Sequence, residues 1–316
     1  MTSKGMTVAA VLFLAVILLG GCARFERKLF DWGVSVERYR SDLVFKTIRV
    51  EGQNISCLER KGSGDTIVLL HGFGANKDTW ISFIRYMPKN FHVFAIDLAG
   101  HGDSSLDMDL SYDIRHLTDI FSLTVDSLGL HRFHLAGNSL GGYVAMLYAA
   151  ENPQKLISLG LFASAGILCP EPTDFQLALG EGEPPITIDS EESFDRMMNR
   201  VFFKKPFIPW PIRSVVVRQC IERKKFEKKM WNDIWENHPD AKKLLPQIQR
   251  PVFLLWGDKD RIMDVSCVKV YQRYLPHAET VIIENCGHGL IFEKSKETAG
   301  AYAKFLQNMK NHKTEE

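Results

Sequence analysis

The sequence predicts an α/β fold: a mostly parallel, doubly wound sheet with an inserted helical cap and an N-terminal membrane segment. Three observations lead to this prediction. From residue 45 onward, short apolar runs of strand length alternate with segments of helical length, as they do where helices cover both faces of a parallel sheet. That alternation stops between residues 169 and 249 and then resumes. The first 23 residues are dominated by one long apolar run.

Composition places the chain among ordinary globular proteins. Its 316 residues are 45% hydrophobic and 24% charged, enough to bury a large core. The formal net charge of +1 creates no general attraction to nucleic acid, so we expect no nucleic-acid partner. The six cysteines show no paired close spacing, and we expect isolated buried thiols rather than a zinc site or a disulfide framework. The sequence implies no metal and no organic cofactor.

The segment from residue 1 to residue 23 has two interpretations. Residues 6–19 are almost all apolar, which suits the apolar region of a signal peptide better than a membrane span of about 20 residues. Leu19-Gly20-Gly21-Cys22 resembles a bacterial lipobox, in which case Cys22 carries the lipid. Alternatively, the segment is retained as an N-terminal anchor helix. Both interpretations attach the protein to a membrane, which we expect to belong to the bacterial cell envelope.

Residues 24–42 are expected to form a juxtamembrane helix. Phenylalanine, tryptophan and valine are interleaved there with arginine and lysine, without a clean apolar stripe. Such a helix either lies on the lipid surface or packs on the protein, and both interpretations stay open.

The globular core is predicted in two parts, residues 43–168 and residues 250–316. It begins with a hairpin of residues 45–50 and 55–59 across a polar turn that contains glycine. Further strands are expected at 66–70, 92–96, 132–136, 156–162, 251–256 and 280–283. Helices are expected at 78–87, 114–128, 142–150, 265–274 and 298–309.

Residues 169–249 separate the two parts and are predicted to form a cap or lid. They are rich in proline and aromatic residues, and only residues 215–217 suggest a strand. Their apolar content exceeds that of a solvated linker, so we expect a mostly helical insertion above the sheet. Around Phe226, lysine and arginine residues form either a solvated helix face or a contact with anionic lipid headgroups.

The most informative motif is Gly137-Asn138-Ser139-Leu140-Gly141, which has the pattern Gly-x-Ser-x-Gly. The pattern often arises by chance, but here a strand is expected before it and a helix after it, which is the context of a nucleophile elbow. The flanking glycines leave out Cβ atoms where strand and helix crowd the turn. The hydroxyl of Ser139 would then stand exposed above the sheet, and the Leu140 N–H would lie at a helix N-terminus.

Candidate acids for a catalytic serine follow a later strand, at the edge where open parallel sheets place their ligands. After the strand that ends at residue 256 come Asp258, Asp260 and Asp264. We favour Asp260, which lies far enough past the strand to reach a histidine, and keep Asp258 as the second choice. Asp264 is placed to cap the next helix.

His288 is the expected base, because the glycines on both sides of it let its ring approach the serine. His277 falls at the opposite end of the sheet, and His312 falls in the C-terminal tail. The resulting chain order of serine, aspartate and histidine is one of the recurring orders of a catalytic triad.

The loop His71-Gly72-Phe73-Gly74 follows a predicted strand and resembles a loop that supplies an oxyanion donor. We assign one donor to the Phe73 N–H and the other to the Leu140 N–H, and expect His71 to order the loop. Residues 97–104 also follow a strand. We interpret them as a structural turn, because a carboxylate nucleophile would require an aspartate in the elbow, which holds Ser139.

These residue types suit acyl transfer to a serine. His288 would take the proton of Ser139 and pass it to the leaving alcohol. Asp260 would hold the imidazole in the correct tautomer and stabilise the imidazolium. The expected intermediate is an acyl-enzyme on Ser139.

From about Phe45 to Met309 the sequence resembles the α/β-hydrolase superfamily. The segments His71–Trp80, Met87–Asn90 and Glu284–His288 are similar to those of its membrane-bound monoacylglycerol-lipase branch, whose pattern bacterial family V lipases and membrane-anchored bacterial phospholipases A share. The resemblance maps the nucleophile, acid, base and oxyanion donors onto the residues chosen above: Ser139, Asp260, His288, Phe73 and Leu140. The cap matches least, and the cap would set substrate choice.

The resemblance implies a membrane-attached serine carboxylic ester hydrolase of the lipase, monoacylglycerol-lipase or phospholipase A type, with a lipid ester as its substrate. Relatives of this kind are usually anchored by a retained N-terminal helix. The alternatives are a carbon–carbon bond hydrolase with the same triad, a short-chain esterase, and a binding protein that has lost catalysis.

Overall fold

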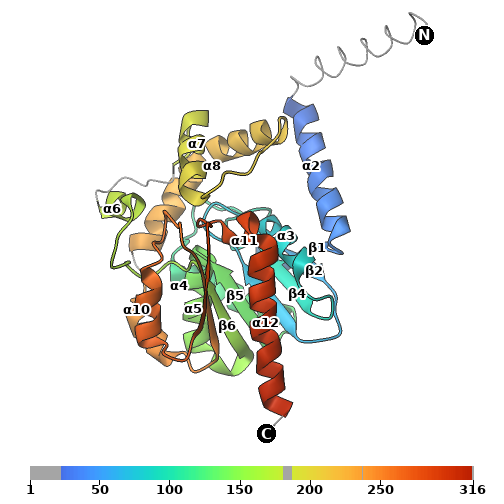
Figure 1. Ribbon diagram of the computed structural model, residues 1–316. Helices are drawn as coiled ribbons and strands as arrows, with labels where there is room; N and C mark the ends of the chain where they lie inside the picture. The colour runs from blue at the N-terminus through green and yellow to red at the C-terminus, as the bar shows by residue number, and fades with distance from the viewer. Residues whose placement is uncertain (1–22, 181–186, 237, 315–316) are drawn as a thin grey trace, which may run out of the picture.

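A single eight-stranded sheet forms the centre of the computed structural model, which describes residues 23–180, 187–236 and 238–314. Helices lie on both faces of the sheet, as the sequence predicts for an α/β fold (Figure 1). Within the described residues, no helix is both long and apolar enough to cross a membrane. The apolar run of residues 6–19 and Cys22 lie outside the described part.

The sheet is parallel except at one side. Its strand order is β1-β2-β4-β3-β5-β6-β7-β8. β1 pairs antiparallel with β2, and β2 with β4, whereas every other pairing is parallel. The strands are β1 Val44–Val50, β2 Gln53–Arg60, β3 Thr66–Leu70, β4 His92–Ile96, β5 Phe133–Asn138, β6 Leu156–Phe162, β7 Val252–Gly257 and β8 Glu279–Ile283.

The first hairpin is tighter than the sequence suggests. Val50 pairs with Gln53, so only Glu51 and Gly52 form the turn. Both have positive φ, 48° and 78°, as a two-residue hairpin turn that matches the twist of its strands requires.

Helices of the core pack in two layers. α3 (Ile81–Tyr86) and α12 (Ser295–Thr314) lie together on one face, and α4 (Ile114–Ser127) and α5 (Leu140–Glu151) lie together on the other (Figure 1). The shorter helices are η1 Lys77–Trp80, η2 Pro153–Lys155, α10 Cys267–Tyr274 and α11 Leu290–Glu293. α5 is buried from Leu140 to Ala149, as expected for a helix that is apolar all round.

The regular elements described in the region expected to form the cap are all helices. It contains α6 Asp174–Gly180, α7 Glu191–Val201, α8 Ile212–Glu236, α9 Ala241–Leu244 and the short η3 Leu245–Gln247. α6, α7 and α8 stand above one end of the sheet (Figure 1). The suggestion of a strand at residues 215–217 was wrong: they belong to α8. Burial of Val215 and Val217 outweighs the weak strand preference of a valine run.

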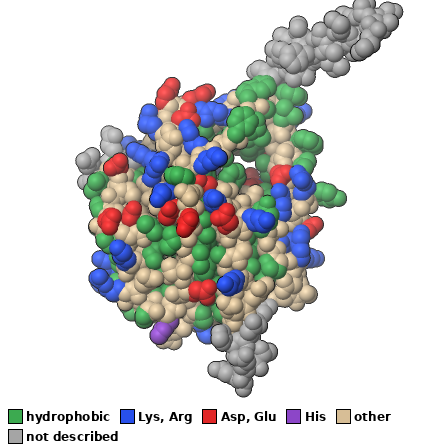
Figure 2. Space-filling view, viewed as in Figure 1, with side chains coloured by type: hydrophobic (Ala, Val, Ile, Leu, Met, Phe, Trp, Pro, Cys, Tyr) green, Lys and Arg blue, Asp and Glu red, His purple; other side chains and the backbone are tan. Residues whose placement is uncertain are grey.

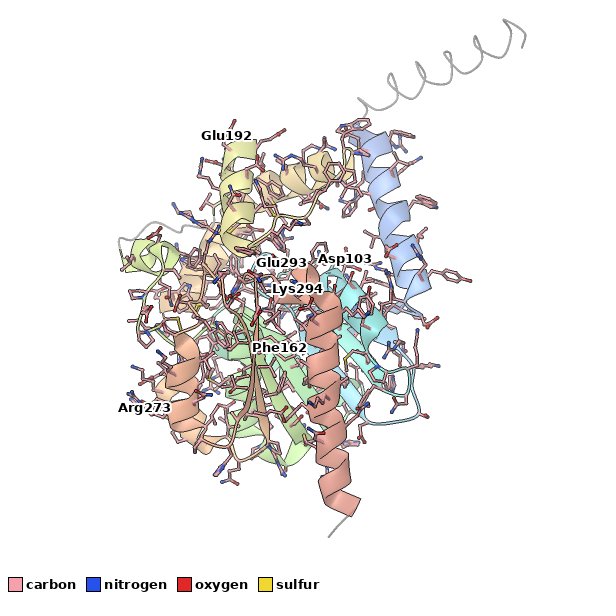
Figure 3. All side chains as sticks on the ribbon, in the orientation of Figure 1. Asp103, Phe162, Glu192, Arg273, Glu293 and Lys294 are labelled. Atoms are coloured by element: carbon pink, nitrogen blue, oxygen red, sulfur yellow. A yellow bond between two sulfur atoms is a disulfide. The ribbon has the colours of Figure 1, made fainter. Side chains whose placement is uncertain are left out.

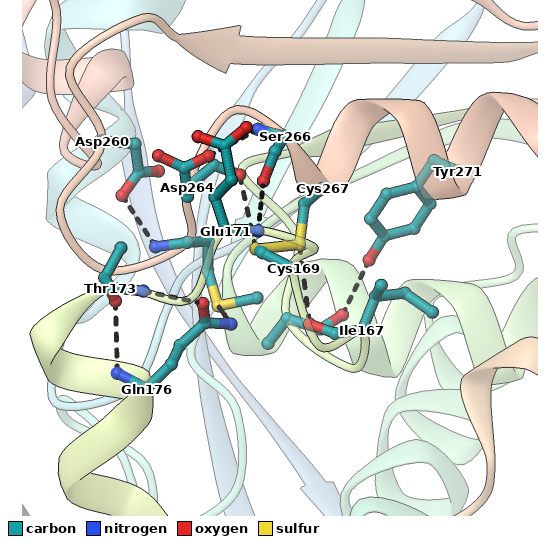
Figure 4. The surroundings of a disulfide bond; sticks show 12 residues. Ile167, Cys169, Glu171, Thr173, Gln176, Asp260, Asp264, Ser266, Cys267 and Tyr271 are labelled. Carbon is teal, nitrogen blue, oxygen red and sulfur yellow. Dashed lines mark hydrogen bonds between the residues drawn. A yellow bond between two sulfur atoms is a disulfide. The ribbon is translucent and has the colours of Figure 1, made fainter.

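A disulfide bond joins Cys169 to Cys267, which contradicts the expectation that all cysteines are isolated thiols (Figure 4). The two residues are 98 positions apart, so their spacing in the sequence does not indicate that they form a pair. In the folded chain their Cα atoms lie 4.3 Å apart. The expectation of isolated buried thiols holds for Cys57 and Cys286, whereas Cys220 is free but only partly buried. The bridge closes the loop that contains the cap.

The juxtamembrane helix, α2 (Ala23–Arg40), contacts the rest of the protein at both ends. Near its C-terminus Arg38 makes two hydrogen bonds of 2.6 Å to the carboxylate of Asp78. Near its N-terminus the buried Glu26 pairs with Arg218 of α8. Between these ends, Trp32 remains 68% exposed. The helix therefore packs on the protein through its ends and leaves an apolar side chain in solvent.

Candidate active site

Ser139 occupies the sharp turn between β5 and α5. Its φ of 53° and ψ of −116° lie outside the regions that a serine prefers, as expected of the strained residue of a nucleophile elbow. The residues on both sides, Asn138 and Leu140, are buried, whereas Ser139 itself is partly exposed. The turn thus presents this side chain at the surface of the sheet edge.

The glycines of the motif are required by close backbone contacts. A Cβ atom at Gly137 would overlap the carbonyl group of Gly141. One at Gly141 would lie 2.5 Å from the carbonyl oxygens of Leu70 and His71. The prediction that these glycines let strand and helix approach each other is confirmed.

Asp260 and His288 form a buried hydrogen-bonded pair. His288 Nδ1 lies 2.8 Å from Asp260 Oδ2, and both side chains are almost inaccessible to solvent. The other carboxylate oxygen of Asp260 accepts the N–H groups of Ile262 and Met263, each at 2.8 Å. These three hydrogen bonds fix the carboxylate. With the proton on Nδ1, the Nε2 atom of His288 is left as a base.

Asp258, the second choice for the acid, is engaged elsewhere. It pairs with Lys259 at 3.0 Å and accepts the Cys286 N–H at 3.2 Å. Asp264 accepts the Ser266 N–H at 2.7 Å just before α10, whose N-cap is Ser266. The geometry therefore favours Asp260 as the partner of His288.

The glycines beside His288 make room for the cap. A Cβ at Gly287 would lie 2.6 Å from the carbonyl oxygen of Val201, and one at Gly289 would lie 2.5 Å from the Phe202 ring. The Gly289 N–H also donates to Val201 O at 3.0 Å. The sequence-based reason for these glycines was access of the imidazole to the serine. The contacts show that they let the end of α7 rest on the histidine loop.

Glu293 is a residue that sequence reasoning missed. Its carboxylate accepts the N–H groups of Gly287, Phe203 and Lys204, at 2.9, 3.1 and 2.7 Å. Figure 3 places it at α11, beneath the cap. One side chain thereby ties the loop of His288 to the chain that leaves α7. No sequence motif indicates this role of Glu293, because the groups that donate to it are backbone amides.

The loop after β3 lies directly against the serine. A Cβ at Gly72 would lie 3.2 Å from the Cβ of Ser139. The next residue, Phe73, has its ring between His101 and Trp231, in edge-to-face contacts with centroid distances of 5.8 and 5.4 Å. The loop proposed to carry an oxyanion donor is thus held between the core and α8.

His71 orders this loop, as expected. Its Nε2 accepts the Leu98 N–H at 3.0 Å and its Nδ1 lies 2.8 Å from Gly72 O. Complete burial lowers the pKa of His71 to about 4, so the imidazole is neutral at physiological pH. A neutral ring with one donor and one acceptor satisfies both bonds.

The turn after β4 is structural, as its sequence suggests. Asp97 accepts the backbone N–H of Lys77 at 2.6 Å, the Lys77 ammonium at 2.8 Å and the Asp103 N–H at 2.9 Å. The ammonium also contacts Asp103 at 2.6 Å. Burial opposes its charge, but the surrounding carboxylates raise the pKa of Lys77. Sequence analysis did not identify this buried lysine.

In the described part of the chain, no group of three or more His, Cys, Asp and Glu residues is arranged to hold a metal ion. Ser139, Asp260 and His288 follow β5, β7 and β8, and neighbouring parallel strands end at the same edge of a sheet.

A mostly parallel eight-stranded sheet with a serine elbow and an aspartate–histidine pair at one edge defines the class of the α/β hydrolases. The chain belongs to this family: the family model described as alpha/beta hydrolase fold matches residues 65–295.

Two relatives and one solved structure are similar to this chain over most of its length. Lipase 1 of Psychrobacter immobilis is 30% identical over 277 residues, which cover 86% of this chain and 87% of the relative. The monoacylglycerol lipase ABHD6 of Mus musculus is 30% identical over 266 residues, covering 80% and 78%. The crystal structure of a membrane phospholipase A, described as a bacterial virulence factor, superposes with a TM-score of 0.89 at 34% identity and covers 98% of this chain and 99% of that one.

Proposed function

We propose that this protein is a membrane-attached serine carboxylic ester hydrolase that cleaves lipid esters through an acyl-enzyme on Ser139. The observation that carries the proposal is the 2.8 Å bond between His288 and Asp260, at the sheet edge where the elbow presents Ser139. The similarity to a lipase, a monoacylglycerol lipase and a membrane phospholipase A supports a lipid ester as the substrate.

In this mechanism His288 Nε2 takes the proton of the Ser139 hydroxyl as its oxygen attacks the ester carbonyl. The same proton then passes to the leaving alcohol, and the acyl group stays on Ser139. A water molecule, deprotonated by His288, then attacks the acyl carbon. The bond from that carbon to Ser139 Oγ breaks, His288 returns the proton to the serine oxygen, and the fatty acid leaves. Asp260 holds the imidazole in place and stabilises its charged form in both steps.

The tetrahedral intermediates need hydrogen-bond donors that are already in position. We assign them to the backbone N–H groups of Phe73 and Leu140. The contact between Gly72 and Ser139 supports the first assignment, and the position of Leu140 as the first residue of α5 supports the second. A donor of this kind typically lowers the barrier by about 3–4 kcal/mol.

Two independent features support attachment to a membrane and a location outside the cytosol. The apolar run of residues 6–19 can insert in lipid, either as a retained helix or before lipidation of Cys22. The Cys169–Cys267 disulfide is typical of proteins outside the reducing cytosol, which supports a location in the cell envelope. A substrate embedded in the same membrane is then available without passing through water.

A fluorophosphonate probe tests the serine chemistry. Full-length protein extracted from membranes is expected to be labelled, whereas Ser139→Ala is not; a wild type that resists labelling contradicts the proposal. Rates on p-nitrophenyl butyrate, monoolein and phosphatidylglycerol then rank the short-chain esterase, monoacylglycerol lipase and phospholipase activities. Mass spectrometry of the N-terminus distinguishes the anchors, because a retained Met1 excludes lipidation of Cys22.

A further inference from the structure

The chain between α7 and α8 exposes large aromatic side chains. Phe207 is 89% exposed and Trp210 is 56% exposed. Phe203 and the neighbouring Lys204 and Lys205 are exposed as well. We call residues 203–210 the aromatic loop. A soluble surface rarely carries such a concentration of apolar area without a partner.

Both ends of the aromatic loop are fixed. At its start, the N–H groups of Phe203 and Lys204 donate to Glu293, which also holds the loop of His288. Its end leads into α8, whose Arg218 pairs with Glu26 of α2. The loop therefore spans from the candidate base to the juxtamembrane helix and presents its aromatic side chains on a supported backbone.

The loop ends beside the place where the N-terminal segment joins the described structure. α8 begins near the upper end of α2 (Figure 1). Figure 2 shows hydrophobic side chains gathered there and a hollow in the surface below them, between the cap and α2. The apolar run of residues 6–19 directly precedes this end of α2. A membrane into which this apolar run inserts would therefore lie close to the aromatic loop.

The chemistry of this end fits a lipid surface with anionic headgroups. Leu29 and Trp32 on α2 are further exposed apolar side chains, at 36% and 68%. Arg24 and Lys28 on α2 are exposed, as are Lys204 and Lys205 in the loop. Aromatic side chains with neighbouring lysine and arginine are the composition of segments that lie in the membrane interface.

We propose that the aromatic loop inserts into the anionic membrane surface beside the N-terminal segment, so that the hollow between the cap and α2 and the loop of His288 face the lipid. This proposal rests on the proposed function, because the membrane segment and the lipid substrate belong to it. The loop is then a second membrane contact, which sets the orientation of the protein, in addition to the anchor.

The first test uses tryptophan fluorescence of the full-length protein in vesicles of phosphatidylglycerol and phosphatidylcholine with brominated acyl chains. We expect the bromines to quench part of the emission in the wild type and that part to be missing in Trp210→Phe. Equal quenching of the two proteins overturns the proposal. This readout is independent of catalysis, so it survives a failure of the proposed function.

The second test compares two substrates. We expect Phe207→Ser/Trp210→Ser to lower hydrolysis of vesicle lipid about tenfold, since less apolar area enters the interface, while the rate on soluble p-nitrophenyl butyrate changes less than about twofold. Tyr86→Ser on α3 is the matched control, because Tyr86 is also 50% exposed. It is expected to leave both rates unchanged.

Two results would overturn the proposal in this second test. An equal loss on both substrates would make the loop a structural part of the cap. A dimer in detergent that the double variant dissociates, measured by light scattering, would make this face a contact between two copies of the chain. A wild type inactive on both substrates contradicts the proposed function instead.

Discussion

The ring of Phe73 meets the indole of Trp231 edge-to-face, with centroids 5.4 Å apart. Phe73 lies in the loop that contacts Ser139, and Trp231 belongs to α8 of the cap. Trp231 in turn contacts Phe175 and Trp235. The position of the proposed oxyanion donor is therefore coupled to the position of the cap.

Trp231→Ala is expected to lower kcat on p-nitrophenyl butyrate about tenfold, because an aromatic pair contributes about 0.5–1.5 kcal/mol and its loss frees the Phe73 loop. Trp231→Phe keeps a ring at this position and should recover most of the rate. The expected change is in kcat, since the donor acts on the transition state. A rise in KM alone would show that Trp231 only binds substrate.

Asp260→Asn is expected to reduce kcat by about 10⁴-fold, because the amide would favour the wrong imidazole tautomer. Asp258→Asn is the control, since Asp258 bonds to Lys259 and the Cys286 N–H rather than to the imidazole. Steady-state rates of both variants on one soluble ester decide the assignment. A larger loss in Asp258→Asn would reverse it.

Lys77→Met is expected to lower the free energy of unfolding by about 3–5 kcal/mol, because it leaves Asp97 buried without its counter-charge. Lys77→Met/Asp97→Asn removes both charges and should restore part of that loss. Denaturant unfolding of the wild type, Lys77→Met, Asp97→Asn and the double variant measures the effect. If the double variant is as unstable as the sum of the two single changes, the pair is not coupled.

Glu227 on α8 makes stability depend on pH. Burial raises its pKa to about 7, and the nearby Arg223 offsets only part of this effect. The folded protein therefore binds a proton more tightly than the unfolded chain, whose carboxyl group has a pKa near 4.5. The contribution of this group to the free energy of unfolding is fully present below about pH 4.5. It is lost as the pH rises from about 4.5 to about 7, on the order of 3 kcal/mol in total.

Glu227→Gln should abolish this contribution and make the protein more stable than the wild type at pH 8, with a smaller difference at pH 5. Free energies of unfolding of both proteins across this range test the sign. A wild type whose advantage over the variant grows with pH would contradict it.

Removal of the Cys169–Cys267 bridge is expected to destabilise the protein. A disulfide that closes a loop of this length restricts the unfolded chain by an amount equivalent to about 4–5 kcal/mol in the chain-entropy model. A reducing agent should lower the Tm of the wild type, and Cys169→Ala/Cys267→Ala should have the lower Tm without it. The double variant is also the control, because its own Tm should not respond to the reducing agent.

The features that sequence analysis predicted depend on residues that are close together in the sequence. Strands 66–70, 92–96 and 156–162 have the observed bounds, because strands buried on both faces are continuous apolar runs. The elbow was predicted because its glycines and serine lie within one stretch of five residues, and the backbone contacts of Gly137 and Gly141 explain why glycine stands at both positions. The family followed from short motifs, each of ten residues or fewer.

Contacts between distant segments were decided only by the folded chain. Cys169 and Cys267 meet because β6 and β7 are neighbours in the sheet, although their spacing in the sequence is too long to indicate a pair. Glu293 binds backbone amides of two loops, and backbone amides carry no sequence signal. The valines of residues 215–217 became helical because α8 buries two of them. Amino-acid order determined the elements and the reacting groups, whereas the packing of the cap on the sheet determined what holds those groups in place.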